Sequence, residues 1–324
     1  MTILLTGAAG FIGSHVTKAL IARGEEVLGI DSLNTYYDPK LKQARLHELE
    51  RLKGFRFTFA DLGRFPALMA AAHAARERIT AVVHLAAQAG VRHSIDHPLD
   101  YLSANLGGHL HVLELARQLP NLRHLVYASS SSVYGASQRV PFGLDDPCDR
   151  PVSLYAATKR SDELMSEAYA GLYGIPQTGL RFFTVYGPAG RPDMAYFKFT
   201  AGILAGTPID VMGDGTQRRD FTYIDDIVAG ILAALDRPPG RERLHRLFNL
   251  GNDRPERLSH LLELVERACG RKAKVNHLPP AAGDVPSTWA DISVSRSELG
   301  YDPKTPLEEG IPRFVEWYRR YSAG

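Results

Sequence analysis

Short apolar runs and longer amphipathic segments alternate along the first half of the chain. Apolar runs bounded by turn residues indicate buried strands, whereas apolar residues three or four apart, as at Ile12, Val16 and Leu20, indicate a helix. The pattern predicts strands at residues 2–6, 26–30, 56–60, 81–85, 122–128 and 177–183, and helices at 10–23, 99–118 and 153–173. Because strands that alternate with helices form βαβ units, we expect an α/β fold with a Rossmann-type, doubly wound parallel sheet.

The pattern changes in the second half of the chain. Beyond Pro188 the expected elements are shorter, and glycine and proline breaks are more frequent. We therefore expect a first domain at residues 1–183 and a smaller mixed α/β lobe, which holds the substrate, at residues 184–324. Residues 217–237 are a candidate for returning to the first domain, and a cleft is expected between the two lobes.

Composition limits the partners of the chain. Hydrophobic residues make up 44% and charged residues 23%, and 38 Lys and Arg against 36 Asp and Glu leave a net charge of +2. This small charge gives no field to attract nucleic acid or an anionic membrane, and no run reaches the ~18–20 apolar residues of a membrane span. With only two cysteines and no signal-peptide pattern, we expect a cytoplasmic protein that acts on a small molecule.

A glycine motif follows the first predicted strand and opens the first helix. Gly7 allows a tight turn, Gly10 lets the backbone approach a pyrophosphate, and Gly13 lets the helix pack closely on the sheet. Asp31 ends the second strand, where a carboxylate accepts hydrogen bonds from an adenosine ribose and repels a 2′-phosphate. The motif therefore predicts a dinucleotide site that prefers NAD to NADP.

Other candidates for the cofactor site follow the third and fourth strands. Asp61 is placed to reach the adenine, although it could instead cap the following helix. Small residues after the fourth strand let the backbone approach the dinucleotide. The complete predicted set is Gly7, Gly10, Phe11, Ile12, Gly13, Asp31, Asn34, Asp61, Leu62, Leu85, Ala86, Ala87, Tyr155 and Lys159.

A tyrosine and a lysine four residues apart suggest a general base. Tyr155 and Lys159 share one face of a helix, and a cation beside a phenol stabilises the phenolate. Tyr36 and Lys40 have the same spacing, but they lie in the loop after the second strand, near the expected adenosine end. The position of Tyr155 after the fifth strand therefore favours it as the base.

Four serines, residues 129–132, follow the fifth predicted strand directly. Ligands of parallel sheets bind at this edge, and hydroxyl groups there can bond a sugar oxygen and the phenol. A flexible turn is the alternative interpretation, but the strand before the serines and Val133-Tyr134-Gly135 after them favour a functional role.

Together these motifs resemble the extended short-chain dehydrogenase/reductase superfamily and, within it, the UDP-glucuronate 4-epimerases. The blocks that carry the closer resemblance are residues 31–38, 86–92, 153–159, 190–195 and 218–226. The resemblance implies an isomerase that holds NAD tightly and inverts C4 of a UDP-sugar through a transient 4-keto intermediate. It also implies a homodimer in which helices 99–118 and 153–173 form a four-helix bundle.

The resemblance assigns the catalytic residues. Tyr155 would take the proton from the sugar 4-hydroxyl while hydride passes from C4 to NAD, and hydride would return to the other face of the sugar. Lys159 would hold the nicotinamide ribose and stabilise the phenolate. Ser130 would steer the 4-oxygen.

It also assigns substrate contacts. Ser130, Ser131, Ser132, Thr184 and Arg191 would surround the sugar and its carboxylate. Arg92 and Arg219 would approach the UDP phosphates, and Asp284 would contact the nucleotide. Ala281 departs from the family pattern, because Arg or Gln usually stands there, so one nucleotide contact is in question.

Several alternatives stay open. A UDP-glucose/UDP-galactose 4-epimerase is the nearest, and a UDP-glucuronate decarboxylase is another, because oxidation at C4 makes a β-keto acid. A 4,6-dehydratase lacks its Asp-Glu pair here, since Ser131 and Ser132 stand in those places. A non-catalytic NAD-sensing protein would not need Tyr155, Lys159 and Ser130 together. His93 and His97 have helical metal spacing without a carboxylate motif, so we expect no metal site.

Overall fold

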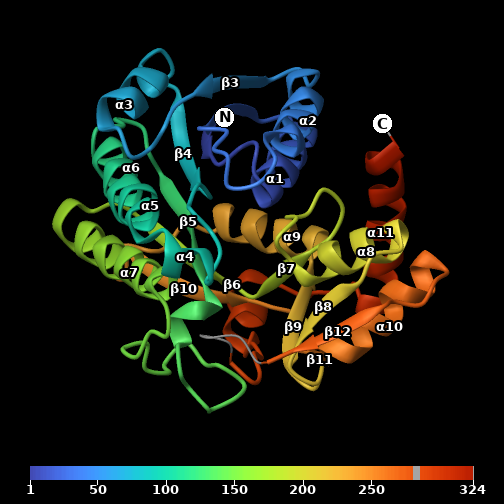
Figure 1. The fold of residues 1–324 in the computed structure, drawn as a ribbon. Helices are drawn as coiled ribbons and strands as arrows, with labels where there is room; N and C mark the ends of the chain where they lie inside the picture. Colours follow the sequence, from blue (N-terminus) through green and yellow to red (C-terminus); the bar gives the residue numbers. More distant parts are fainter. Residues whose placement is uncertain (280–284, 324) are drawn as a thin grey trace.

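A seven-stranded parallel sheet forms the centre of the computed structural model, which describes residues 1–279 and 285–323 (Figure 1). In spatial order its strands are β10 (His245–Leu250), β6 (Gln177–Phe182), β5 (His124–Ser130), β4 (Ile79–His84), β1 (Thr2–Thr6), β2 (Glu26–Asp31) and β3 (Phe55–Phe59). The chain runs from β1 outward to β3, then returns to β4 and continues to the other edge. The order reverses between β1 and β4, the place where such sheets bind ligands at the carboxyl ends of their strands.

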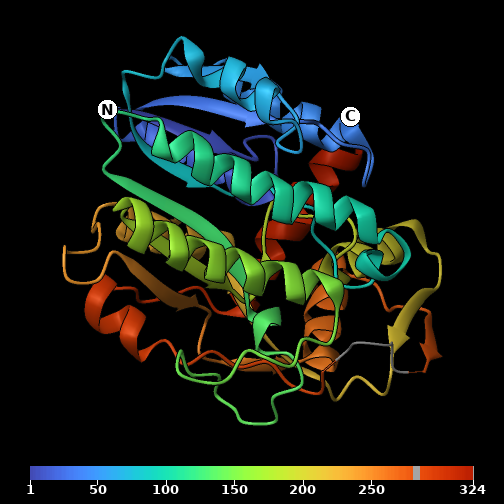
Figure 2. The same ribbon diagram turned by 90° about the vertical axis from the view of Figure 1, so that its left-hand side faces the viewer.

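Helices cover both faces of the sheet (Figure 1), and Figure 2 looks onto one of these faces. On one face pack α1 (Phe11–Ala22), α2 (Pro39–Glu50) and α9 (Ile224–Leu235). On the other face lie α3 (Phe65–His73), α6 (Gly108–Arg117) and α7 (Leu154–Tyr173). Because the sheet is covered on both sides, β1 is buried at all five positions, and its near-continuous apolar sequence suits that place.

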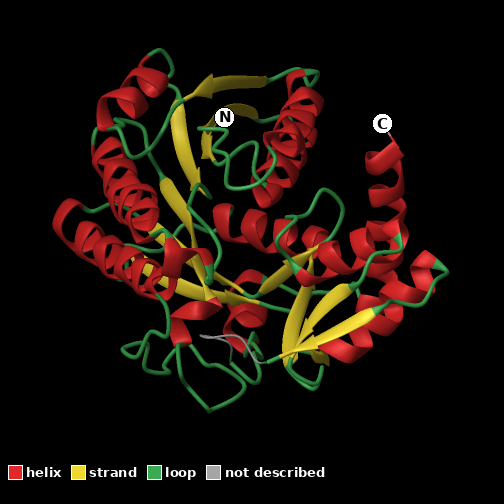
Figure 3. Cartoon of the chain, viewed as in Figure 1, coloured by secondary structure: helices red, strands yellow, loops and turns green. Residues whose placement is uncertain are grey.

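Smaller strands and three helices form the second lobe (Figure 3). One sheet joins β7 (Thr184–Tyr186), β9 (Arg218–Tyr223) and β11 (Pro255–Arg257), and another pairs β8 (Ile209–Met212) with β12 (Val275–Leu278). The helices of this lobe are α8 (Ala195–Ala205), α10 (Leu258–Cys269) and α11 (Leu307–Ala323). The remaining short helical segments are α4 (His93–Asp96), α5 (Pro98–Tyr101), η1 (Leu102–Gly107), η2 (Ser131–Tyr134) and η3 (Ser295–Leu299).

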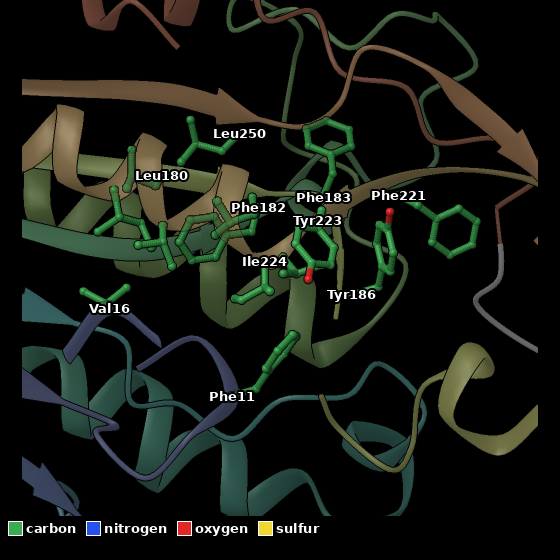
Figure 4. Close-up of a cluster of buried hydrophobic side chains, with 14 of the residues drawn as sticks. Phe11, Val16, Leu180, Phe182, Phe183, Tyr186, Phe221, Tyr223, Ile224 and Leu250 are labelled. Carbon is green, nitrogen blue, oxygen red and sulfur yellow. The ribbon is translucent and has the colours of Figure 1, made fainter. Parts of the chain in front are cut away.

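The two lobes share one hydrophobic core. The cluster in Figure 4 joins Phe11 and Val16 of α1 to Phe182 at the end of β6, to Ile224 of α9, and to Phe221 of β9 in the second lobe. Burial of one continuous apolar cluster holds the lobes in a fixed relation. The cleft between them is therefore a built feature of the fold.

The structure confirms the α/β fold with its Rossmann-type sheet and smaller mixed lobe. It adds β10 to the sheet, a strand that the sequence analysis did not assign. Within residues 217–237, α9 returns to cover β5 and β6, whereas β9 stays in the smaller sheet. The division into domains at residues 183 and 184 stays a prediction.

The helix expected at residues 99–118 is interrupted by a π-helical stretch, η1. Asn105 in this stretch is buried, and its side chain accepts from the Gln88 amide at 2.8 Å and donates to the Gln88 carbonyl at 3.1 Å. It also donates to Thr158 Oγ1 at 3.0 Å. The widened turn thus ties the loop after β4 to α7, and π-helical turns are frequent near functional sites.

Candidate active site

A cavity of about 1040 Å³ runs along the carboxyl ends of the strands and into the second lobe. It begins at the glycine loop after β1 and ends among residues of α8 and β9. The predicted site residues that line it are Gly7, Gly10, Phe11, Ile12, Gly13, Asp31, Asn34, Asp61, Leu62, Leu85, Ala86, Ala87, Arg92, Ser130, Ser131, Ser132, Tyr155, Lys159, Thr184, Arg191 and Arg219. Asp284 and Ala281 lie outside the described residues.

The glycine loop leaves no room for side chains. Gly7 has a φ of 76°, and a Cβ there would lie 2.8 Å from the Ala86 amide nitrogen. A Cβ on Gly13 would lie 2.0 Å from the Gly7 carbonyl oxygen. The backbone of β1, α1 and the loop after β4 therefore closes into a cradle at the amino end of α1, which suits a pyrophosphate.

Asp31 is held at the end of β2 by the backbone. Its Oδ2 accepts from the Ala9 amide at 3.1 Å, and its Oδ1 accepts from the Leu33 amide at 2.8 Å. The carboxylate is buried beside the glycine loop, where a ribose would meet it. Sequence reasoning missed Lys42, which lines the same end of the cavity and donates to the Asn34 carbonyl at 3.0 Å.

Asp61 does not cap a helix. Its Oδ1 accepts from the Gly63 amide at 2.9 Å, and α3 begins only after Arg64. The side chain instead belongs to a tight turn on the cavity wall. This position leaves Asp61 a candidate for adenine contact.

Helix α7 brings the predicted base to the cavity. Ser153 Oγ accepts from the Ala156 amide at 3.1 Å, which fixes the helix start at the edge of the sheet. Tyr155 lies in the first turn with its side chain half-buried, and Lys159 lies one turn later, buried. Lys159 Nζ donates to the Ala128 carbonyl at 3.0 Å and to Asp162 Oδ2 at 2.9 Å.

The competing pair has a different place. The Tyr36 hydroxyl donates to Asp193 Oδ2 at 3.1 Å, and Lys40 is exposed at the start of α2. Tyr36 lines the cavity, but its phenol serves a carboxylate there. Burial, with a contribution from the Asp193 charge, raises the pKa of Tyr36 to about 12. Tyr36 is therefore unsuited to act as a base at neutral pH.

The four serines separate into two roles. The Ser129 hydroxyl donates to Glu163 Oε1 at 2.6 Å within a buried network. Ser130 Oγ accepts from the Ser132 amide at 3.1 Å, which starts the tight turn η2. That turn presents Ser130, Ser131 and Ser132 on the cavity wall. The serine run therefore forms a hydrogen-bonded turn at the cavity, and its functional role stays a prediction.

Arg191 is held by a carboxylate that sequence reasoning missed. Its Nε donates to Asp193 Oδ1 at 3.0 Å, and its Nη2 donates to Oδ2. Burial alone would raise the pKa of Asp193, but Arg191 and the Tyr36 hydroxyl overcome this and hold it below its usual range. The fork fixes the guanidinium at the wall of the cavity, which Arg191 lines.

The loop that carries Arg191 is also anchored from the first lobe. Arg45 of α2 is buried, and its guanidinium donates to the Ala189 carbonyl at 3.1 Å and to the Gly190 carbonyl at 3.1 Å. It donates as well to the Ala9 carbonyl in the glycine loop at 3.1 Å. One side chain thus links the two ends of the cavity. Its only sequence signal is a charged residue on the inner face of an amphipathic helix.

Two further arginines stand at the far end of the cavity. Arg92 precedes α4, and Arg219 lies on β9, where its Nη1 donates to the Arg218 carbonyl at 2.8 Å. Both line the cavity together with Thr184 at the start of β7. The two arginines place positively charged side chains at this end of the cavity.

The two spaced histidines, His93 and His97, lie near the carboxylate of Asp100. His93 and His97 stack with ring centroids 4.2 Å apart, and His93 Nε2 lies 3.5 Å from Asp100 Oδ2. His97 and Asp100 are exposed, and exposed acidic groups commonly occur in such clusters without a metal ion. The absence of a metal site stays a prediction.

Comparison with known proteins places these observations in a family. The sequence model of the NAD dependent epimerase/dehydratase family matches residues 3–251. UDP-glucuronate 4-epimerase 4 of Arabidopsis thaliana is 47% identical over 100% of this chain and 76% of its own length. A probable UDP-glucuronate 4-epimerase of Rhizobium meliloti is 46% identical over 98% of this chain and 97% of its own.

A solved structure agrees with the sequences. UDP-glucuronic acid 4-epimerase from Bacillus cereus, in complex with UDP-glucuronic acid and NAD, matches with a TM-score of 0.91 and 34% identity. The match covers 99% of this chain and 100% of that one. The resemblance inferred from the motifs is confirmed, and the glycine cradle fits the cofactor that the family uses. The chain belongs to the NAD-dependent epimerase/dehydratase family, within the extended short-chain dehydrogenases/reductases.

Proposed function

We propose that this enzyme inverts C4 of UDP-glucuronate to give UDP-galacturonate, and that it catalyses the reverse reaction. One observation carries the proposal: a single cavity joins the glycine cradle, Tyr155 with Lys159, and the forked Arg191 at the sugar end. The relatives named as UDP-glucuronate 4-epimerases support the same substrate.

The chemistry divides between cofactor and protein. NAD, when bound, accepts a hydride from C4 and returns it to the opposite face of the sugar. Tyr155 takes the proton of the 4-hydroxyl at its phenol oxygen and gives it back when the hydroxyl reforms. Lys159 holds a positive charge beside the phenol and the nicotinamide ribose, and Ser130 hydrogen-bonds the 4-oxygen.

The sugar carboxylate would be bound by Arg191 together with Ser131, Ser132 and Thr184. Charge-assisted hydrogen bonds from a guanidinium fix the orientation as well as the position of a carboxylate. This orientation matters, because the 4-keto intermediate is a β-keto acid that loses carbon dioxide when its carboxylate stands perpendicular to the ketone. The proposed contacts keep the carboxylate away from that geometry.

At the other end of the substrate, Arg92 and Arg219 would bind the diphosphate. A UDP-glucose/UDP-galactose 4-epimerase remains the second candidate, since only the carboxylate contacts distinguish the two.

Product analysis tests the proposal. Purified enzyme is incubated with UDP-glucuronate, without added reductant, and the sugars are followed by NMR. We expect UDP-galacturonate to accumulate to a constant ratio with the substrate. Formation of a UDP-pentose with carbon dioxide would show a decarboxylase, and turnover of UDP-glucose alone would contradict the role of Arg191.

We also propose a homodimer formed through α6 and α7. These helices lie side by side on one face of the molecule (Figure 2). Both helices expose large apolar side chains: on α7, Leu164 is 56% exposed and Leu172 is 73% exposed, and on α6, Leu110 is 38% exposed. Covering such residues is the ordinary reason for association. Light scattering should give twice the chain mass for the native protein and a monomer for Leu164→Glu.

The setting of the reaction is proposed to be the cytoplasm, without nucleic acid or membrane as partner. Both cysteines, Cys148 and Cys269, are free and buried, as suits a reducing compartment. Among the described residues, no helix has the length and apolar character needed to cross a membrane.

A further inference from the structure

A buried carboxylate stands directly behind the proposed catalytic lysine. Asp162 is 0% exposed and lies one helical turn after Lys159 on α7. Its Oδ2 accepts from Lys159 Nζ at 2.9 Å, and within the described part of the chain its Oδ1 has no hydrogen-bond partner. The proposed reaction gives Asp162 no role, yet burying a carboxylate is costly unless it is well paired.

The lysine is fixed by two protein contacts. Lys159 has only 4% of its side chain exposed, and its Nζ donates to the Ala128 carbonyl at 3.0 Å as well as to Asp162. An ammonium has three hydrogens, so one remains to be directed at the cavity. Asp162 and Ala128 together therefore determine where the ammonium points.

Among the described residues, Lys159 is the positively charged group that pairs with Asp162. On α7 itself, Glu163 is engaged by Arg160 of the same helix, by Arg181 of β6 and by Ser129 of β5. The titratable groups packed against this part of α7 are His84 on β4, His109 on α6, Tyr127 on β5, and His245 on β10, which pairs with the exposed Glu167.

Burial keeps the two nearest imidazoles neutral. Burial, assisted by the Lys159 charge, lowers the pKa of His109 to about 3 and that of His84 well below its usual value. Burial also raises the pKa of Tyr127 well above its usual value, so this phenol is neutral too. The local charge thus depends on Lys159, Asp162 and the separately paired Glu163.

We propose that Asp162 is a positioning residue that aims the Lys159 ammonium and, through its own negative charge, weakens the field by which that ammonium stabilises the Tyr155 phenolate. The inference rests on the proposed roles of Tyr155 and Lys159. A carboxylate 2.9 Å from the ammonium offsets part of the positive potential at any third group nearby. Asp162 therefore determines how strongly the Lys159 charge favours the phenolate form of Tyr155.

The pH response follows from burial. Burial raises the pKa of Asp162 to about 6, although Lys159 acts in the opposite direction. Burial lowers the pKa of Lys159, but Asp162 and Tyr155 outweigh it, so the ammonium keeps its charge. Above about pH 6 the Tyr155 phenol lies near an ion pair of Lys159 and Asp162. Below this pH Asp162 is neutral, and the Lys159 ammonium stabilises the phenolate with its full charge.

Tyrosinate absorbance of the NAD-loaded enzyme tests this without catalysis. A pH titration is recorded for the native protein and for Asp162→Asn, and the same titration of each with Tyr155→Phe is subtracted to isolate Tyr155. The amide keeps the shape and a hydrogen bond to Lys159 while it removes the charge. We expect the midpoint of the Tyr155 signal to fall by about one pH unit, from Coulomb interaction across a few ångströms.

Glu167→Gln is the matched control. It removes one negative charge from the same helix, but the side chain is 71% exposed and reaches His245 instead of the lysine. Its midpoint should stay within about 0.2 pH units of the native value, because solvent screens an exposed charge. If Asp162→Asn does not fold, as judged by circular dichroism, Asp162→Ser replaces it.

A Tyr155 midpoint that is unchanged in the Asp162 variant, or that moves upward, overturns the inference. A different result would contradict the proposed function: activity that survives Tyr155→Phe would show that Tyr155 is not the catalytic base. The pH profile of kcat gives a second readout. The acidic limb should move to lower pH in Asp162→Asn and stay in place in Glu167→Gln.

Discussion

Two cation–carboxylate pairs flank the same cavity, and they are built differently. Lys159 and Asp162 lie on one rigid helix, with Asp162 fully buried behind the ammonium. Arg191 and Asp193 lie on a loop of the second lobe, and 27% of the Asp193 side chain is exposed. In both pairs the cation lines the cavity, but Asp162 is buried away from it, whereas Asp193 lines the cavity beside its arginine. Each carboxylate is a candidate for tuning its cation.

The difference lies in the number of donors. Asp193 accepts two bonds from Arg191 and one from Tyr36, and its pKa falls although burial opposes this. Asp162 accepts one bond from Lys159, and burial raises its pKa to about 6. Mild acid therefore neutralises the carboxylate at the catalytic end and leaves the one at the substrate end charged. Burial without enough donors makes a titratable pair, whereas a full set of donors makes a permanent one.

Loss of the proposed base, Tyr155, should have the largest effect. Tyr155→Phe keeps the ring and removes the proposed base, so we expect kcat to fall by about 10³-fold or more. Initial rates of UDP-galacturonate formation measure this. The NAD content of the variant should match the native enzyme, and a variant with near-native kcat would contradict the role of Tyr155.

Loss of the substrate-end cation should come next. Arg191→Ala removes charge-assisted hydrogen bonds to the sugar carboxylate, each worth about 1.5–3 kcal/mol, so kcat/KM for UDP-glucuronate should fall by about 10–100-fold. UDP-glucose has no carboxylate, so its kcat/KM serves as the control and should change much less. An equal loss for both substrates would show that Arg191 acts on something other than the carboxylate.

Loosening the substrate-end pair should have a smaller effect. Asp193→Asn keeps the shape and one acceptor but removes the charge that fixes Arg191. We expect a roughly fivefold loss of kcat/KM for UDP-glucuronate, together with a rise in carbon dioxide release as the carboxylate is held less firmly. Product ratios by NMR check this, and an unchanged ratio would mean that Arg45 and the loop hold Arg191 without Asp193.

The effects on stability separate the two carboxylates by sign. A raised pKa means that the native state binds the Asp162 proton more tightly than the unfolded chain, so the carboxyl contributes less to stability as pH rises from about 4 to about 6. Asp162→Asn should therefore gain stability relative to native protein across this range, by on the order of 1–3 kcal/mol.

Asp193 should behave in the opposite way. Its lowered pKa gives stability that is present above the ordinary carboxyl range and is lost as pH falls through it. Urea unfolding of Asp162→Asn, Asp193→Asn and native protein at several pH values between 4 and 7 measures both slopes. If the stability difference from native protein changed with pH in the same direction for both variants, the proposed contrast between the two carboxylates would be wrong.

Much of the cofactor end was readable from the sequence. The glycine motif, Asp31 and the small residues after β4 are local signals, set by strand ends, helix starts and turns that involve neighbouring residues. The Tyr155 and Lys159 pair was ambiguous by spacing alone, and the position of its helix after the fifth strand favoured it. Lys42, Asp193 and Arg45 were missed, because each acts across the fold.

By itself, the sequence determined the alternation of strands and helices, the strand–turn–helix cradle and the shared helical face of Tyr155 and Lys159, since all depend on residues within a few positions of each other. Tertiary structure decided the rest. Tyr36 meets Asp193 across 157 residues, and Arg45 meets Gly190 across 145. Asp162 is an ordinary helical aspartate in the sequence, and only the packing of the neighbouring strands and helices against α7 excludes water and turns it into a titratable partner of the lysine.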